Sequence, residues 1–323
     1  MSPRRFFGMV SVAAACAACD GSDAVAATEG DATVSEASVD AAPDAPLGDA
    51  EAGAHPTTQA VIAHRGASGH APEHTLAAYE LAVELGADYL EQDVGMTKDG
   101  VLVCLHDATL DRTARGDAAS CSGALRDKTL AQIKTCDVGS WFNEANPELA
   151  RPEYAGLSIP TLAEVFERFG TEASYYIETK TLGGSTPMEP ELYRLIDEHG
   201  LREAAVLHRG VVIQSFDATS LQRMRDTDAE LPLVQLLLVA PDDAALDALD
   251  PLFGIAPPAA TTTEDLIGKA HARQLAVHAY TVNDAAELEQ LAARCVDGMF
   301  TNFPDRYRSV LEATKLPCPA AIR

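Results

Sequence analysis

Short apolar runs followed by amphipathic stretches recur along the chain from about residue 60 onward. The first run, Val61–Ala63, is typical of a buried strand. Residues 75–85 then carry apolar side chains at helical spacing and end before Gly86, which favours an amphipathic helix. A strand followed by a helix is one unit of a parallel α/β fold.

Seven further segments share this apolar strand pattern and are separated by helical stretches. They are Tyr89–Val94, Tyr175–Lys180, Val211–Ser215, Leu233–Val239, Phe253–Ala256, Leu275–Tyr280 and Val296–Phe300. A (β/α)₈ barrel takes about 250 residues, and the part of the chain from Ala60 to Arg323 offers that length. The pattern therefore predicts one α/β domain, a TIM barrel over residues 60–323.

Between the second and third barrel units the expected connection is long. Lys98-Asp99-Gly100 is a turn signal, and Val101–Leu105 is an apolar run that ends at His106-Asp107. Residues 108–158 then exceed an ordinary barrel loop, which predicts an insertion on the substrate side. Trp141 either lines the pocket or packs the insertion.

Alternation in two of the strands places acidic side chains on common faces. Glu91 and Asp93 share one face because successive strand side chains point in opposite directions. Two such carboxylates resist joint burial unless a cation compensates them, and oxygen ligands suit calcium or magnesium. Glu178 is expected to complete the set of protein side chains that bind the cation, and Lys180 lies on the same side of its strand.

Two histidines follow strand ends. His64 comes directly after the first strand and His106 after the run that ends at Leu105. Arg65 and Lys180 offer cationic groups for a phosphate, Arg65 as a planar fork. Taken singly, each of these residues has a plainer explanation as a structural histidine or a surface charge. Together, at the carboxyl ends of barrel strands, they favour an active site.

The chain resembles the glycerophosphodiester phosphodiesterases, and in particular their secreted bacterial branch, over roughly residues 60 to 313. The segments that carry the resemblance are His64-Arg65-Gly66-Ala67-Ser68-Gly69, Pro72-Glu73-His74-Thr75-Leu76, Gly86-Ala87-Asp88-Tyr89-Leu90-Glu91-Gln92-Asp93, Met96-Thr97-Lys98-Asp99-Gly100, His106-Asp107, Ile177-Glu178-Thr179-Lys180, Gln214-Ser215-Phe216, Tyr280-Thr281-Val282-Asn283 and Val296-Asp297-Gly298-Met299-Phe300-Thr301-Asn302-Phe303-Pro304-Asp305. The family's fold is a (β/α)₈ barrel.

The resemblance implies a role for each of several residues. Glu91, Asp93 and Glu178 would bind calcium, or less readily magnesium, while His64 and His106 would serve as acid and base in an order that stays open. The implied substrate contacts are Arg65, Lys180, Gln214, Phe216 and Tyr280. Many relatives have tryptophan where this chain has Tyr280, and His74 receives no catalytic role.

The activity implied is metal-dependent hydrolysis of glycerophosphodiesters to glycerol 3-phosphate and an alcohol. The family suggests that the glycerol 2-hydroxyl attacks, giving a cyclic phosphate that water opens. Two alternatives stay open: a lysophospholipase D or sphingomyelinase D-like lipase, and a noncatalytic lipoprotein that captures glycerophosphodiesters.

The first residues predict export from a bacterial cell. Arg4-Arg5 precede an apolar stretch from Phe6 to Ala15, which is too short to span a bilayer as a mature helix. Cys19, or less favourably Cys16, follows small residues as in a bacterial lipoprotein signal, which would anchor the protein to a membrane. A plain signal peptide cleaved near Ala27 is the alternative.

Residues 20–59 predict an acidic tether, because they hold nine acidic residues and no Lys or Arg, with few large apolar groups. The whole chain has a formal net charge of −25, and the part from Ala60 onward remains strongly acidic. Nucleic acid is therefore not expected as a partner. The sequence does not indicate the oligomeric state.

Five of the seven cysteines lie beyond the leader. In an oxidising compartment we expect Cys121 to pair with Cys136 and staple the insertion. Cys295 and Cys318 either pair, pinning the carboxyl tail to the last helix, or stay free. Cys104 is expected as a buried strand residue beside the site.

Overall fold

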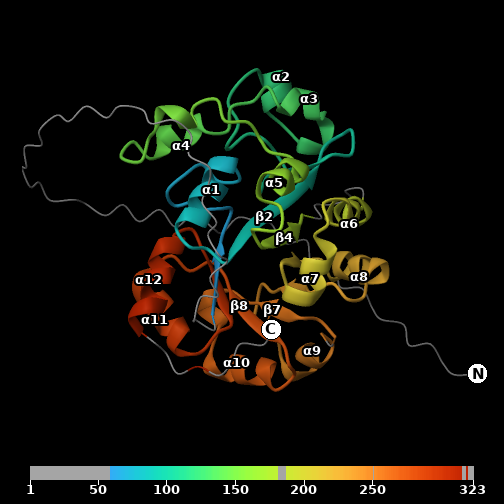
Figure 1. The fold of residues 1–323 in the computed structure, drawn as a ribbon, viewed down its shortest axis with the longest axis vertical. Helices are drawn as coiled ribbons and strands as arrows, with labels where there is room; N and C mark the ends of the chain where they lie inside the picture. Colours follow the sequence, from blue (N-terminus) through green and yellow to red (C-terminus); the bar gives the residue numbers. More distant parts are fainter. Residues whose placement is uncertain (1–58, 181–186, 250, 315–317, 319–323) are drawn as a thin grey trace, which may run out of the picture. The chain divides into compact units, whose positions relative to one another are not determined.

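The computed structural model describes residues 59–180, 187–249, 251–314 and 318. Eight parallel strands form a closed barrel, since β1 pairs with both β9 and β2 (Figure 1). These strands are β1 (Ala60–Ala63), β2 (Tyr89–Met96), β4 (Tyr175–Thr179), β5 (Val211–Ser215), β6 (Leu233–Leu236), β7 (Gly254–Ala256), β8 (Ala276–Ala279) and β9 (Gly298–Thr301). The predicted TIM barrel is confirmed.

Helices follow the barrel strands along the chain. They are α1 (Leu76–Glu84), α5 (Leu162–Phe169), α6 (Glu189–Glu198), α7 (Arg202–His208), α8 (Ala218–Thr227), α9 (Asp243–Asp247), α10 (Glu264–His271), α11 (Ala285–Ala293) and α12 (Pro304–Thr314), with a 3₁₀ turn at Ala259–Thr261. Several of these helices begin after a residue whose side chain accepts a hydrogen bond from the first turn. Thr161 and Glu164, for example, form a reciprocal capping box at α5.

The strand β3 (Leu102–Cys104) lies outside the closed barrel and pairs antiparallel with the last residues of β2. The turn between them contains Gly100, whose φ of +82° glycine adopts without steric cost. The predicted turn is therefore present, and β3 returns the chain to the rim at His106.

Between β3 and α5 the chain forms a small lobe of short helices. These are α2 (Ala118–Cys121), α3 (Leu130–Ile133) and α4 (Ser140–Ala145), with 3₁₀ turns at Leu125–Asp127 and Pro152–Tyr154. A disulfide joins Cys121 to Cys136, with their Cα atoms 5.5 Å apart. The lobe has its own buried cluster, which includes Leu110, Leu125 and Ile133, so it packs as a unit beside the barrel.

The barrel interior is filled by large side chains from alternate strand positions. Ile62, Tyr176, Val212, Val234 and Phe300 form one buried cluster. Fully burying an aliphatic or aromatic side chain stabilises a fold by about 1.5–3 kcal/mol. This layer makes the interior a packed core and leaves the carboxyl ends of the strands to carry chemistry.

One predicted strand is too long. The sequence predicts a strand over the whole of Leu233–Val239, but β6 ends at Leu236, and Leu238 and Val239 are 64% and 70% exposed. An apolar run does not by itself require a strand when no neighbour covers it, and Pro241 follows closely.

Near the carboxyl end, a second disulfide joins Cys295 to Cys318. Cys104 on β3 is a buried thiol. Gln59, expected at the end of the tether, is buried and donates to the carbonyl of Ala292. The predicted leader with Cys16 and Cys19, and the tether up to residue 58, lie outside the described residues. Within the described part of the chain, no helix is long and apolar enough to cross a membrane.

Candidate active site

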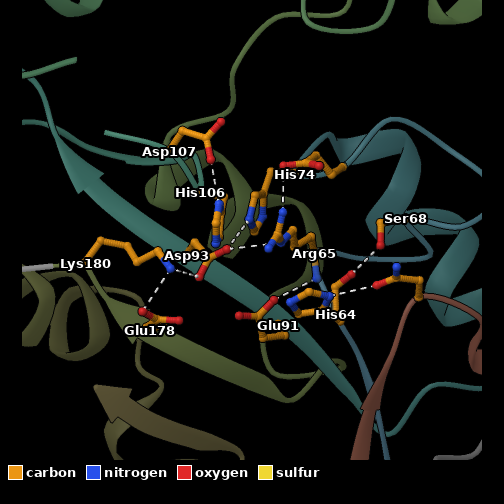
Figure 2. A network of polar contacts seen from close by, with 12 residues as sticks. His64, Arg65, Ser68, His74, Glu91, Asp93, His106, Asp107, Glu178 and Lys180 are labelled. Carbon is orange, nitrogen blue, oxygen red and sulfur yellow. Dashed lines mark hydrogen bonds and ion pairs between the residues drawn. The ribbon is translucent and has the colours of Figure 1, made fainter. Parts of the chain in front are cut away.

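Figure 2 shows that the side chains predicted to act in catalysis, metal binding and phosphate binding lie close together: His64, Arg65, Glu91, Asp93, His106, Glu178 and Lys180. His64 directly follows β1, Lys180 follows β4, and the loop after β3 carries His106. Phe216 and Tyr280 follow β5 and β8. All of these positions lie at the carboxyl ends of strands or of the β2–β3 hairpin, where barrel enzymes place their catalytic groups.

Three carboxylates lie side by side within this end of the barrel. Glu91 and Asp93 share the inner face of β2, and Asp93 is paired in register with Glu178 on β4. Their exposed fractions are 1%, 1% and 7%. Glu91 is anchored by the Arg65 backbone N–H, which donates to its Oε2 atom at 2.7 Å.

Burial and mutual repulsion give these carboxylates unusual pKa values. Burial, followed by the charges of Asp93 and Glu178, raises the pKa of Glu91 well above its usual range. Burial and the charge of Asp93 raise the pKa of Glu178 to about 8. Burial acts in the same sense on Asp93, but Lys180, His74 and Arg65 outweigh it and hold its pKa well below the usual range.

This acidic cluster fits a divalent cation. A buried carboxylate whose pKa is raised gains its charged form when a cation lies beside it. Potential ligand atoms of Glu91, Asp93 and His74 all lie within 4.8 Å of one another. Gln214 donates to Glu91 at 3.4 Å, and its own Oε1 atom is buried without a hydrogen-bond partner among the described residues. The Gln214 Oε1 atom therefore remains as an acceptor without a partner beside the carboxylates.

His74 is the residue of this cluster that received no role from the sequence. It has a φ of +54°, an uncommon conformation for a histidine. Its Nε2 atom lies 2.8 Å from Asp93 Oδ2, and its Nδ1 atom lies 2.9 Å from the Tyr79 hydroxyl. His74 thus orients Asp93, and burial lowers its pKa.

His64 is hydrogen-bonded to a neutral partner. Its Nδ1 atom donates to the Oδ1 atom of Asn302 at 2.8 Å. Burial, and then the neighbouring Arg65 guanidinium, lower the pKa of His64 to about 3. The ring is therefore uncharged at neutral pH, with its Nε2 atom as a proton acceptor.

His106 is hydrogen-bonded to a charged partner. Its Nδ1 atom donates to Asp107 Oδ1 at 2.7 Å. His106 and Arg112 hold the pKa of Asp107 below its usual range against the opposing effect of burial. The two histidines therefore differ in the group that holds the ring, a neutral amide for His64 and a carboxylate for His106.

The two cationic candidates lie against the acidic cluster. Lys180 Nζ is 3.3 Å from Asp93 Oδ1 and 3.0 Å from Glu178 Oε1, and Arg65 Nε is 3.5 Å from Asp93 Oδ2. Both side chains are less than one-fifth exposed. Both cationic groups therefore border the carboxylates on the rim.

Two aromatic rings form an apolar edge of the site. Phe216 and Tyr280 make an edge-to-face contact with ring centroids 6.0 Å apart, and Phe216 is 41% exposed. The Tyr280 hydroxyl donates to the carbonyl of Leu237, which fixes the ring. Trp141, for which the sequence left two roles open, packs edge-to-face on Phe142 of α4 and lies under the Arg112 guanidinium.

Several polar residues at the site had no role predicted from the sequence: His74, Asp107, Asn302, Glu73 and Arg112. Each holds another site residue by a hydrogen bond or an ion pair. Asp107 had a sequence signal, since it directly follows His106. Glu73, His74 and Asn302 lie in segments that carry the family resemblance, but their contacts, like those of Arg112, are made only in the folded chain.

Fold and site together define a (β/α)₈-barrel enzyme with an acid–histidine site on its carboxyl rim. Residues 64–306 match the glycerophosphoryl diester phosphodiesterase family. The glycerophosphodiester phosphodiesterase of Bacillus subtilis (strain 168) is 42% identical over 254 residues, which cover 77% of this chain and 85% of that protein.

Solved structures agree with this match. A putative glycerophosphoryl diester phosphodiesterase from Silicibacter pomeroyi has a TM-score of 0.71 at 25% identity, covering 82% of this chain and 97% of that one. An Oleispira antarctica phosphodiesterase in complex with the product sn-glycerol-3-phosphate has a TM-score of 0.68 at 26% identity, covering 78% and 96%. This chain belongs to the glycerophosphoryl diester phosphodiesterase family. The predicted family and the predicted enzyme class are confirmed, and the secreted bacterial branch stays a prediction.

Proposed function

We propose that this enzyme hydrolyses glycerophosphodiesters to glycerol 3-phosphate and an alcohol with the help of a bound divalent metal. The observation that carries the proposal is the pairing of two rim histidines with unlike partners, Asn302 and Asp107, beside three buried carboxylates. One histidine is thereby suited to accept a proton and the other to donate one.

Glu91, Asp93 and Glu178 would hold the metal, with His74 orienting Asp93. Oxygen ligands of this kind favour calcium or magnesium, and we favour calcium because an exported protein meets it outside the cell. When bound, the metal supplies charge neutralisation and polarisation at the phosphate oxygens.

His64 acts as the general base and His106 as the general acid. The Nε2 atom of His64 takes the proton of the attacking hydroxyl, and the Nε2 atom of His106 gives a proton to the leaving alkoxide as its P–O bond breaks. Arg65 and Lys180 bind the phosphate oxygens, Arg65 through its planar guanidinium. No covalent enzyme intermediate is required.

The attacking oxygen in the first step is the 2-hydroxyl of the substrate's own glycerol, which gives a cyclic phosphate. A glycerol moiety is therefore obligatory. Water then opens this ring with the histidines in reversed roles, and the net reaction adds one water across the P–O bond. The Phe216–Tyr280 edge is placed to contact the organic part of the substrate.

The test is product analysis with a matched set of phosphodiesters. Glycerophosphocholine, glycerophosphoethanolamine, lysophosphatidylcholine and the analogue of glycerophosphocholine without the 2-hydroxyl are each incubated with the full chain and calcium. We expect glycerol 3-phosphate from the first two and no turnover of the analogue. Preference for lysophosphatidylcholine would favour the lipase alternative, and binding without release would favour a capture protein.

We further propose that the protein is exported and tethered through a lipidated Cys19. The leader pattern, the acidic tether and two disulfides support this placement, because disulfides persist in oxidising compartments. Metabolic labelling with a fatty acid analogue tests it. Label on the wild type and none on Cys19→Ser is the expected result, whereas label-free soluble protein would favour plain cleavage.

A further inference from the structure

Arg112 lies in the inserted lobe and joins two loops of the active-site rim. Its Nε atom donates to Asp107 Oδ2 at 2.7 Å. Its two terminal nitrogens donate to both carboxylate oxygens of Glu73, at 2.9 and 2.7 Å. One guanidinium therefore bridges the loop after β3 and the loop between β1 and α1.

Each of the two carboxylates that Arg112 contacts also contacts a residue with a proposed role in the reaction. The other oxygen of Asp107 accepts the Nδ1–H of His106 at 2.7 Å, and Glu73 Oε1 lies 3.2 Å from Arg65 Nη1. The ion-pair chain thus runs from His106 through Asp107, Arg112 and Glu73 to Arg65. This chain of contacts links His106, the proposed general acid, to Arg65, which is proposed to bind the phosphate.

The lobe in turn fixes Arg112. Its guanidinium lies over the ring of Trp141, with 5.7 Å to the centroid. Arg115 donates to the Arg112 carbonyl and pairs with Glu144 at 2.9 Å. Trp141 and Glu144 both belong to α4, so side chain and backbone of Arg112 are held from one helix.

Such a bridge differs from an ordinary surface ion pair, which contributes little. The Glu73 side chain is only 11% exposed and accepts a bidentate contact, the geometry in which arginine binds carboxylates best. Arg112 and Arg65 hold the pKa of Glu73 at about 2 although burial opposes ionisation. Lysine has no planar fork with which to bridge two carboxylates.

We propose that Arg112 is a positioning residue that sets His106 through Asp107 and Arg65 through Glu73, which makes the inserted lobe a functional part of the site. Its three rim hydrogen bonds all go to protein carboxylates, so it acts through other residues. The inference rests on the proposed roles of His106 and Arg65 in phosphodiester cleavage.

The test compares Arg112→Ala and Arg112→Lys with the wild type. The matched control is Arg151→Ala, which removes another lobe arginine that lies over an aromatic ring, Tyr154, but whose ion pair is with Glu153 of the same lobe. We expect kcat/KM for glycerophosphocholine to fall roughly 10- to 100-fold in both Arg112 variants, as for displaced catalytic groups. The control should keep wild-type activity.

A second substrate distinguishes displacement of His106 from a general structural effect of the substitution. Glycerol 3-phospho-p-nitrophenol releases a phenolate that needs no proton from His106, so misplacement of the acid costs less with it. We expect the deficit of Arg112→Ala to shrink at least about threefold on this substrate, because protonation of the leaving group is the step most affected. Thermal unfolding of each variant shows whether the fold is kept, and Arg112→Lys, which retains the charge, carries the test if the alanine variant unfolds.

The outcomes are distinct. Full activity of both Arg112 variants would overturn the positioning role while leaving the proposed function in place. An equal deficit on the two substrates would overturn the positioning of His106. No glycerol 3-phosphate from the wild type would instead overturn the proposed function, and with it the positioning role of Arg112.

Discussion

The Nδ1 atom of His64 lies 2.8 Å from the Oδ1 atom of Asn302, so the ring is held by an acceptor that bears no charge. His106 has a carboxylate, Asp107, in the corresponding place. The proposed order, with His64 as the base and His106 as the acid, rests on this contrast; the sequence left the order open.

Replacing Asn302 by Asp should make His64 a poorer base at low pH. A carboxylate on Nδ1 favours the charged ring, so the pKa of His64 rises from its lowered value of about 3. A base works when deprotonated, and therefore the acid limb of the kcat/KM profile should move up by about one pH unit or more. The pH profiles of wild type and Asn302→Asp check this; coincident acid limbs would argue against His64 as the base.

Metal binding should stabilise the folded protein measurably. A ligand at one hundred times its Kd raises the unfolding free energy by about 2.7 kcal/mol. We expect calcium to raise Tm of the wild type by several degrees, and Glu91→Gln to remove most of that rise. His106→Ala should keep it, because His106 is not a ligand. Differential scanning calorimetry with calcium, magnesium or chelator measures these shifts, and an equal rise in Glu91→Gln would place the metal elsewhere.

The buried His278 should make the protein sensitive to acid. Its Nδ1 atom lies 2.8 Å from the Tyr176 hydroxyl inside the barrel, and burial lowers its pKa from 6.5 to about 4. Between pH 6.5 and 4, His278 is protonated in the unfolded chain but not in the folded chain. The free energy of unfolding therefore falls as the pH falls through this range.

The variant His278→Asn keeps an acceptor for Tyr176 and cannot titrate. Between pH 6.5 and 4, the free energy of unfolding of this variant should fall by about 3 kcal/mol less than that of the wild type, since one pKa unit corresponds to about 1.4 kcal/mol. Urea unfolding at the two pH values measures the difference. Equal losses in both proteins would show that His278 is not buried in its neutral form.

The barrel and the main site residues could be predicted from the sequence because both depend on local periodicity. The period of two put Glu91 and Asp93 on one face, and strand ends put His64 and His106 on one rim. Other contacts have no local signal. Asn302 is 238 residues from His64, and Arg112 is 39 residues from Glu73. His74 contacts Asp93 from a backbone conformation with positive φ, which the sequence pattern does not predict.

Metal-assisted catalysis by two histidines is tested most directly by release of glycerol 3-phosphate from glycerophosphocholine. The full chain is assayed with and without chelator, beside His64→Ala and His106→Ala. Chelation should abolish release and calcium should restore it, while each histidine variant should lose about 10²- to 10⁴-fold in rate. Turnover that is indifferent to chelator, or near-normal turnover in either histidine variant, would contradict the proposed mechanism.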